Sequence, residues 1–139
     1  MSNLIDAYEF PTDWSLPTKP GLATEPGQVQ IFGFQIHPTQ VVPMGNRFGI
    51  DTSLGYTTHV NTVFKRLRRE LPRGWRKIVV GSWRRPEGGP QIPTKVVWFN
   101  SNINEAELDK VPDKETMKLV SRLICATEGP RWYKYVRKL

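Results

Sequence analysis

The sequence has few of the residues that metal sites and disulfide-stabilised domains require. Cys125 is the only cysteine among 139 residues, and His37 and His59 are the only histidines. A single cysteine excludes an intrachain disulfide framework and a cysteine-rich zinc site. Two histidines so far apart fit neither an HxH nor an HExxH pattern. We therefore expect no metal site and no cofactor.

Long apolar runs and phosphate-binding loops are also lacking. No apolar segment approaches the roughly 20 residues that span a bilayer, and GxxxxGK followed by Ser or Thr does not occur. The first stretch, MSNLIDAYEFPTDW, is acidic and has no positive region leading into an apolar one, so we expect no signal peptide. We expect a cytoplasmic or nuclear protein, or a component of a viral or other assembled particle, with no small-molecule substrate.

Carboxylates are too sparse and too scattered for an obvious catalytic metal site. A metal-dependent nuclease needs two or three carboxylates around an ion. The string PDKE from Pro112 superficially resembles such a site, but Asp113 as a helix N-cap and Glu115 in the first turn explain it equally well. We therefore expect a protein that is not an enzyme, and keep a small nuclease as the second alternative.

What the chain does have is a strongly basic run, KRLRRELPRGWRKIVVGSWRR, from Lys65 to Arg85. It holds nine Lys or Arg residues against one acid, Glu70, so its net charge of +8 exceeds the +7 of the whole chain. Trp75 and Trp83 lie within it. Cations interleaved with flat rings suit an anionic, partly planar partner, most commonly nucleic acid. A solvated helix face with core tryptophans is the structural alternative.

The first 27 residues differ in charge from the remainder. They hold four acids and one lysine, a net of −3, which leaves +10 for residues 28–139. Their prolines at 11, 17, 20 and 26 prevent a long helix, whereas Tyr8, Phe10 and Trp14 are anchors that a solvated tail would not need. We expect an extended arm, 1–27, lying on the single domain 28–139 or on a neighbouring subunit in a homo-oligomer. Such an acidic arm could cover the basic surface.

The sequence of the domain, residues 28–139, predicts alternating strands and helices. Residues 29–36, 77–83 and 94–100 have the β-branched and aromatic content of strands, and 131–138 that of an edge strand. A helix capped by Thr57 or Thr58 carries the apolar stripe Val60, Phe64, Leu67 and Leu71 and ends at Pro72 to Gly74; a second runs from Asp113 to Gly129 and Pro130. Residues 38–55 are expected to form a loop, with a possible hairpin around 44–47.

This order, βαββαβ, predicts an α+β fold with a small antiparallel sheet and two helices on one face, the ferredoxin-like arrangement. It is also the element order of the RNA-recognition motif, although TKVVWFN lacks that motif's glycine signature. Trp98 and Phe99 are neighbours on a strand and must lie on opposite faces. A ring facing outward from an open sheet would be a stacking platform.

We therefore predict a non-enzymatic protein that binds RNA or single-stranded nucleic acid with low sequence specificity, through backbone charge and aromatic contacts. The C-terminal RWYKYVRKL could form a second contact strip. The candidate binding residues are Lys65, Arg66, Arg68, Arg69, Arg73, Trp75, Arg76, Lys77, Trp83, Arg84, Arg85, Arg131, Trp132 and Lys134.

One alternative is a different class of protein. Trp, Tyr, Lys and Arg, the residues of the C-terminal segment, also favour anionic lipid headgroups. A small matrix-like structural protein could self-assemble through residues 1–27 and bind an anionic membrane or an acidic partner. Residue types alone leave both interpretations open.

Overall fold

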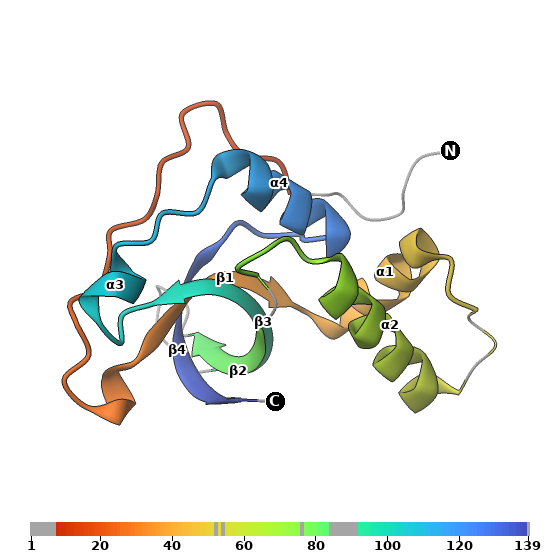
Figure 1. Cartoon of the computed structure of the whole chain (residues 1–139). Coiled ribbons are helices and arrows are strands. Elements are labelled where there is room, and N and C mark those ends of the chain that lie inside the picture. The colour runs from red at the N-terminus through yellow and green to blue at the C-terminus, as the bar shows by residue number, and fades with distance from the viewer. Residues whose placement is uncertain (1–7, 52, 54, 76, 84–91, 139) are drawn as a thin grey trace.

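The computed structural model describes residues 8–51, 53, 55–75, 77–83 and 92–138 (Figure 1). These residues form an α+β fold with a small antiparallel sheet, as the sequence predicts. The strands are β1 (Gln30–Ile36), β2 (Lys77–Trp83), β3 (Ile92–Ser101) and β4 (Arg131–Lys138). The helices are α1 (Val41–Phe48), α2 (Tyr56–Glu70), α3 (Glu105–Leu108) and α4 (Lys114–Leu123), with 3₁₀ turns at η1 (Pro26–Gln28) and η2 (Pro38–Gln40).

The four strands close into a barrel in the order β1–β3–β2–β4, and Figure 1 shows them curling around a common axis. β1 pairs with β3 and β4, and β2 pairs with the same two strands, always antiparallel. The prediction that residues 131–138 form an edge strand is therefore wrong, because β4 pairs on both sides. An open ferredoxin-like sheet is not confirmed, since the pairing of β2 with β4 removes the sheet edges.

Alternation along the strands divides the apolar side chains between two cores. Ile31, Val96 and Tyr133 are buried together inside the barrel. Phe32 and Phe34 point to the other face, where they are buried under the helices. The apolar character of β1 on both faces thus follows from its position between the barrel interior and the helix layer.

Gly33 of β1 lies directly against the backbone of β3. The register between the two strands shifts between Phe32 and Gly33, which marks a bulge or irregularity there. A Cβ added at Gly33 would lie 2.0 Å from the Val97 carbonyl oxygen and 2.7 Å from the Trp98 Cα. Real Cβ atoms essentially never approach backbone atoms that closely, and only glycine fits at this position.

Helix α1 replaces the loop and hairpin expected over residues 38–55, so that prediction is wrong. Val41 and Met44 are buried, and Phe48 packs against the same core. Their spacing of three and four residues puts them on one helix face. The prolines and glycines of the segment concealed this short stripe, since Pro43 lies in the first turn, where its missing N–H is not needed.

Helix α2 carries the predicted stripe. Val63 and Leu67 are fully buried, and Phe64 and Leu71 nearly so. The predicted cap at Thr57 or Thr58 is wrong, because the N-cap is Gly55, two or three residues earlier, and it makes no side-chain cap. The stripe that faces the core determines which cations of α2 remain outside.

Helix α4 begins as predicted and ends sooner. The Asp113 carboxylate accepts a hydrogen bond from the Thr116 backbone N–H at 3.0 Å, which confirms it as the N-cap. The helix ends at Leu123 rather than at Gly129, because Cys125 adopts a left-handed backbone with φ of 51°. Cys125 therefore lies beyond the helix and is half-buried.

The described part of the arm runs along the chain's own body. Tyr8, Phe10 and Trp14 pack in edge-on ring contacts with centroids 5.0 Å apart, and against the helix-side core. Figure 1 shows the arm passing α4 and α3, on the other side of the molecule from α2. The expectation that it covers the basic helix therefore does not fit its position. Leu4 and Ile5, two further apolar residues of the arm, lie outside the described residues.

Candidate nucleic-acid interface

The outer face of α2 presents the best-defined set of cations. Each residue turns about 100° around a helix axis, so Lys65 and Arg69 lie opposite the buried Leu67, and Arg68 lies on the flank. All three side chains are exposed, as is Arg73 in the turn that follows. We call these four residues, Lys65, Arg68, Arg69 and Arg73, the α2 cation face.

No acid neutralises this face within the described residues. Glu70 is the nearest acid in sequence, and it pairs with Arg66 at 3.2 Å. Arg66 also lies over the Phe48 ring, with its guanidinium carbon 5.7 Å from the ring centroid. Arg66 is therefore already engaged by two neighbours, whereas the α2 cation face has no ion pair among the residues described. Its charges remain available to a partner.

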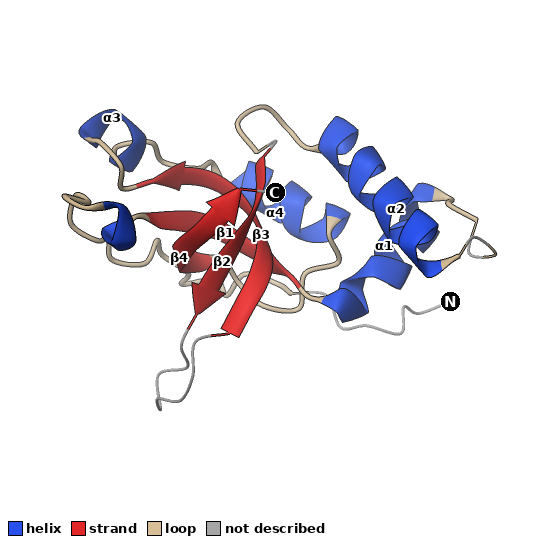
Figure 2. Cartoon of the chain, turned by 90° about the horizontal axis from the view of Figure 1, so that it is seen from below, coloured by secondary structure: helices blue, strands red, loops and turns tan. Residues whose placement is uncertain are grey.

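The position of α2 in the molecule also makes its cations available to a partner. Figure 2 shows α2 at the periphery of the molecule, beside α1 and to one side of the barrel, against which its buried face packs. At 1.5 Å per residue its 15 residues extend over about 22 Å. A helix of that length on an outer edge can lie along a nucleic-acid backbone without collision from the barrel.

Lys95 is a cation that sequence reasoning missed. It lies on β3, is exposed, and its Nζ is 4.6 Å from the centroid of the Phe64 ring of α2. The strand register places it opposite Val80 of the basic run. Its alternation with the buried Val96 was the signal that could have identified it.

Trp75 does not fit its predicted role. Its side chain has 0% exposure, and its ring packs between Phe34 at 5.9 Å and Phe99 at 5.3 Å. A ring enclosed in this way cannot stack on a base, so the structure places Trp75 in the core. The predicted opposition of Trp98 and Phe99 is present: Trp98 packs inside the barrel and Phe99 under the helices.

Closure of the barrel also removes the predicted stacking platform. One face of the sheet surrounds the inner core and the other carries the helices and the arm. In the described residues, no sheet ring faces outward from an open edge. The aromatic part of the predicted interface is therefore not assembled as expected.

The C-terminal strip divides between the surface and the core. Arg131 pairs with Glu128 at 2.8 Å, and Lys134 is exposed. Trp132 is half-buried, with its ring 5.4 Å from that of Phe32. Tyr133 lies inside the barrel, where burial raises the pKa of its hydroxyl strongly. The inward turn of Tyr133 removes one of the aromatic residues on which the membrane alternative depends.

Five of the candidate residues cannot be placed at the side-chain level. Lys77 and Trp83 begin and end β2, opposite Trp98 and Ile92 of β3. Their side chains, and all of Arg76, Arg84 and Arg85, lie outside the described residues. The prediction for these five remains a prediction.

Groups for catalysis or metal binding are not brought together in the described part of the chain. No three His, Cys, Asp or Glu residues gather there. His59 is buried against Gly45, and His37 contacts Thr39 with its ring Nδ1 at 2.9 Å. Burial raises the pKa of the Cys125 thiol, which Arg47 partly opposes, so at neutral pH the thiol keeps its proton.

Known proteins offer no match from which a function of this interface could be inferred. No family model, no curated protein and no solved structure matches the chain. Among the helices described, none is long and apolar enough to cross a membrane.

Proposed function

We propose that this chain is a non-enzymatic nucleic-acid-binding protein that holds RNA or single-stranded nucleic acid mainly through its backbone. The observation that carries the proposal is the α2 cation face, four exposed cations with no ion pair among the described residues. Phosphates are the natural counter-charge for such a row, and flexible Lys and Arg side chains read no base sequence by contacting them.

The expected affinity is strongly salt-dependent. Each phosphate contact on a single strand contributes a slope of roughly −0.7 to log K against log salt. Four contacts give a slope of about −3, which corresponds to roughly a 50-fold weaker binding between 50 and 200 mM salt. Cations of the basic run outside the described residues would steepen it further.

In this proposal, charge contributes more to binding than aromatic stacking does. Trp75 is enclosed and the barrel is closed, so the charge on α2 becomes the main support. The likeness to the RNA-recognition motif is limited to the order of elements, since that motif binds on the open face of a sheet. Backbone contact through a helix is consistent with low sequence specificity.

The test compares two triple variants with equal loss of charge. Lys65→Gln, Arg68→Gln and Arg69→Gln remove three members of the α2 cation face. Lys114→Gln, Lys118→Gln and Arg122→Gln remove three cations from α4 and serve as the matched control. Fluorescence anisotropy with a labelled 20-nucleotide RNA, repeated from 50 to 300 mM salt, gives both the affinity and the slope.

We expect the α2 variant to lose about 2 from the magnitude of the slope and the control to change much less. Equal effects would mean that only net charge matters and that α2 is not the interface. A wild-type chain that binds no RNA at 50 mM salt, and sediments instead with anionic vesicles, would overturn the proposal in favour of the membrane alternative.

A further inference from the structure

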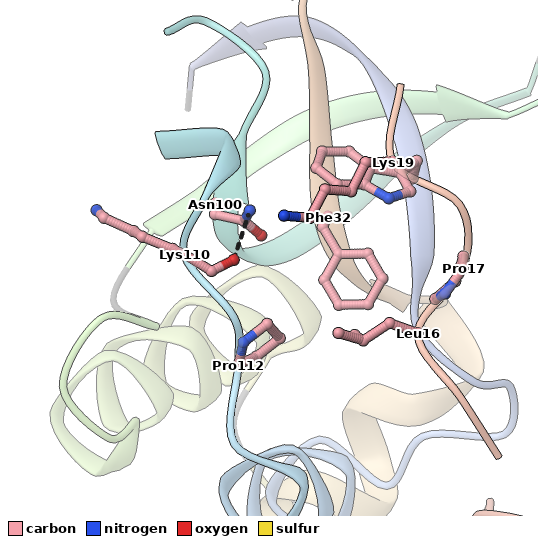
Figure 3. Close-up of a pocket in the computed structure, with 8 residues that line it drawn as sticks. Leu16, Pro17, Lys19, Phe32, Asn100, Lys110 and Pro112 are labelled. Atoms are coloured by element: carbon pink, nitrogen blue, oxygen red, sulfur yellow. Dashed lines mark hydrogen bonds between the residues drawn. The ribbon is translucent and has the colours of Figure 1, made fainter. Parts of the chain in front are cut away.

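A hollow lies under the N-terminal arm, where five segments of the chain meet (Figure 3). Phe32 of β1 and Trp132 of β4 form one aromatic wall, with ring centroids 5.4 Å apart and planes inclined by 50°. Leu16 and Pro17 of the arm cover it, and Pro112 closes the opposite side. These walls are flat and apolar.

One polar group points into this apolar space. Asn100 of β3 is 2% exposed, and its Nδ2 donates to the carbonyl oxygens of Glu107 at 3.0 Å and Lys110 at 3.2 Å. Its Oδ1 is also buried but has no hydrogen-bond partner among the residues described. Figure 3 shows Asn100 beside the hollow, held by the bond to Lys110. A buried acceptor without a donor is costly unless a ligand or water supplies one.

Two cations stand at the rim. Lys19 of the arm is exposed and has no ion pair among the residues described. Lys110 also lines the hollow, and its ammonium pairs with Glu107. An anionic group at the mouth would therefore meet at least one uncompensated positive charge. The site thus combines flat walls, one acceptor inside and positive charge outside.

The arm that covers the hollow is held firmly only at its two ends. At one end the Tyr8 backbone N–H donates to the Ala126 carbonyl oxygen, at 2.8 Å. At the other end, the Asn102 side-chain Nδ2 donates to the Gly21 carbonyl oxygen at 2.9 Å. Among the described residues, Asn102 accepts no hydrogen bond from residues 9–20. We call residues 9–20 the strap. Among the described residues, the strap makes no hydrogen bond to the body, so its described contacts are those of side-chain packing, and Leu16 is 39% exposed.

We infer that the hollow is a site for one nucleotide unit, whose base lies against the Phe32 and Trp132 rings. A ring N–H or exocyclic amine of the base donates to Asn100 Oδ1, and the adjoining phosphate meets Lys19. Every common base carries such a donor, so the site favours bases without selecting strongly among them. The inference rests on the proposed function, and it assigns Trp132 the contact that the sequence predicted for it.

Entry of a base requires the strap to shift. As it stands, the hollow has room for a water-sized group only, about 20 Å³. A water inside would meet Asn100 Oδ1 and few other polar groups, because apart from the two lysines at the rim the remaining lining residues are apolar. Withdrawal of Leu16 and Pro17 would open the aromatic wall from the solvent side, with the strap still tethered at Tyr8 and Gly21.

The experiment uses the full chain labelled with ¹⁵N and two RNA-like hexamers. One is hexauridylate and the other an abasic hexamer that carries the same phosphates without bases. The reporters are the Asn100 side-chain amide and Trp132 indole N–H signals, with the buried Trp75 indole as internal reference. Uridine monophosphate, added alone, shows whether a free nucleotide enters as well as a unit of a strand.

We expect hexauridylate to move the Asn100 and Trp132 signals and to bind about five- to 150-fold more tightly than the abasic hexamer, the range for stacking one base. Trp132→Leu should remove that preference and leave abasic binding unchanged. Lys19→Gln should weaken hexauridylate binding several-fold, compared with Arg122→Gln on α4, which removes one positive charge from another exposed residue, as the control.

The two failures can be told apart. Equal binding of the two hexamers, with both reporter signals unmoved, would overturn the inference while leaving the proposed function in place. No binding of either hexamer at 50 mM salt would refute the proposed function, and the inference with it. Movement with uridine monophosphate alone, or with hexauridylate alone, supports the site and identifies which form of the nucleotide enters.

Discussion

Replacing Trp75 separates a residue that binds a ligand from one that supports the fold. The sequence places it among cations, whereas the structure encloses it between Phe34 and Phe99 with no exposed surface. Trp75→Ala would remove a buried indole and leave a cavity at the centre of the helix-side core. Substitutions of this kind cost about 3–5 kcal/mol.

That loss is large compared with the stability of a small domain, which is about 5–15 kcal/mol. For a chain of 139 residues it corresponds to a fall in Tm of roughly 10–20 °C. Trp75→Phe is the milder variant, because it keeps an aromatic ring beside the two phenylalanines. The indole Nε1 has no hydrogen-bond partner in the described residues, so the change to Phe removes buried volume but no hydrogen bond. We expect it to lower the free energy of unfolding by about 1–2 kcal/mol.

The assay combines urea unfolding, followed by far-ultraviolet circular dichroism, with RNA affinity below the unfolding transition. We expect Trp75→Phe to lower stability and leave the affinity of the folded fraction within about twofold. The opposite result would refute the structural reasoning: unchanged stability with a loss of affinity of tenfold or more means that Trp75 meets the ligand.

Three further outcomes follow from buried contacts. Asn102→Ala removes hydrogen bonds to Gly21, Gln28 and Gln30, so it should destabilise the chain by about 2–4 kcal/mol. It should also speed proteolysis within the arm, which mass spectrometry detects, and an unchanged cleavage rate would contradict the tether at Gly21. Gly33→Ala should prevent folding or cost at least 3 kcal/mol, and a native circular-dichroism spectrum with unchanged Tm would contradict the close approach. Burial raises the pKa of Tyr133 above its ordinary value of 10.0, so as the pH rises the unfolded chain loses this proton before the folded chain does. The free energy of unfolding should therefore fall as the pH rises beyond about 10. Urea unfolding at pH 9 to 11 should show a smaller fall for Tyr133→Phe.

The two candidate contact regions lie on different parts of the molecule. In Figure 1 α2 lies to the right of the barrel, whereas α3 and the arm lie to the left. The α2 cation face supplies sequence-independent charge, and the hollow under the strap supplies a place for one base. A variant at either region should therefore change RNA binding with little effect on the other, and their effects on the binding free energy should add.

Local chemistry determined much of the secondary structure. The stripe in α2, the bounds of β2 and the N-cap at Asp113 depend on residues within a few positions of each other, and the sequence predicts them correctly. The exposure of Lys65, Arg68 and Arg69 follows from the same periodicity, because the stripe that must be buried fixes the opposite face. The charge of the candidate interface was thus readable from the chain.

Only the tertiary structure decided which rings remain accessible and what the arm covers. Barrel closure depends on β2 meeting β4 across more than 50 residues of sequence, and no local pattern specifies that pairing. The same holds for Trp75, whose burial depends on contacts with Phe34 of β1 and Phe99 of β3, and for the hollow, which is lined by five segments of the chain. Residue type determined the charge of this protein and its periodic elements, whereas contacts between distant segments decided which aromatic residues could serve a ligand, since burial is a property of the assembled chain.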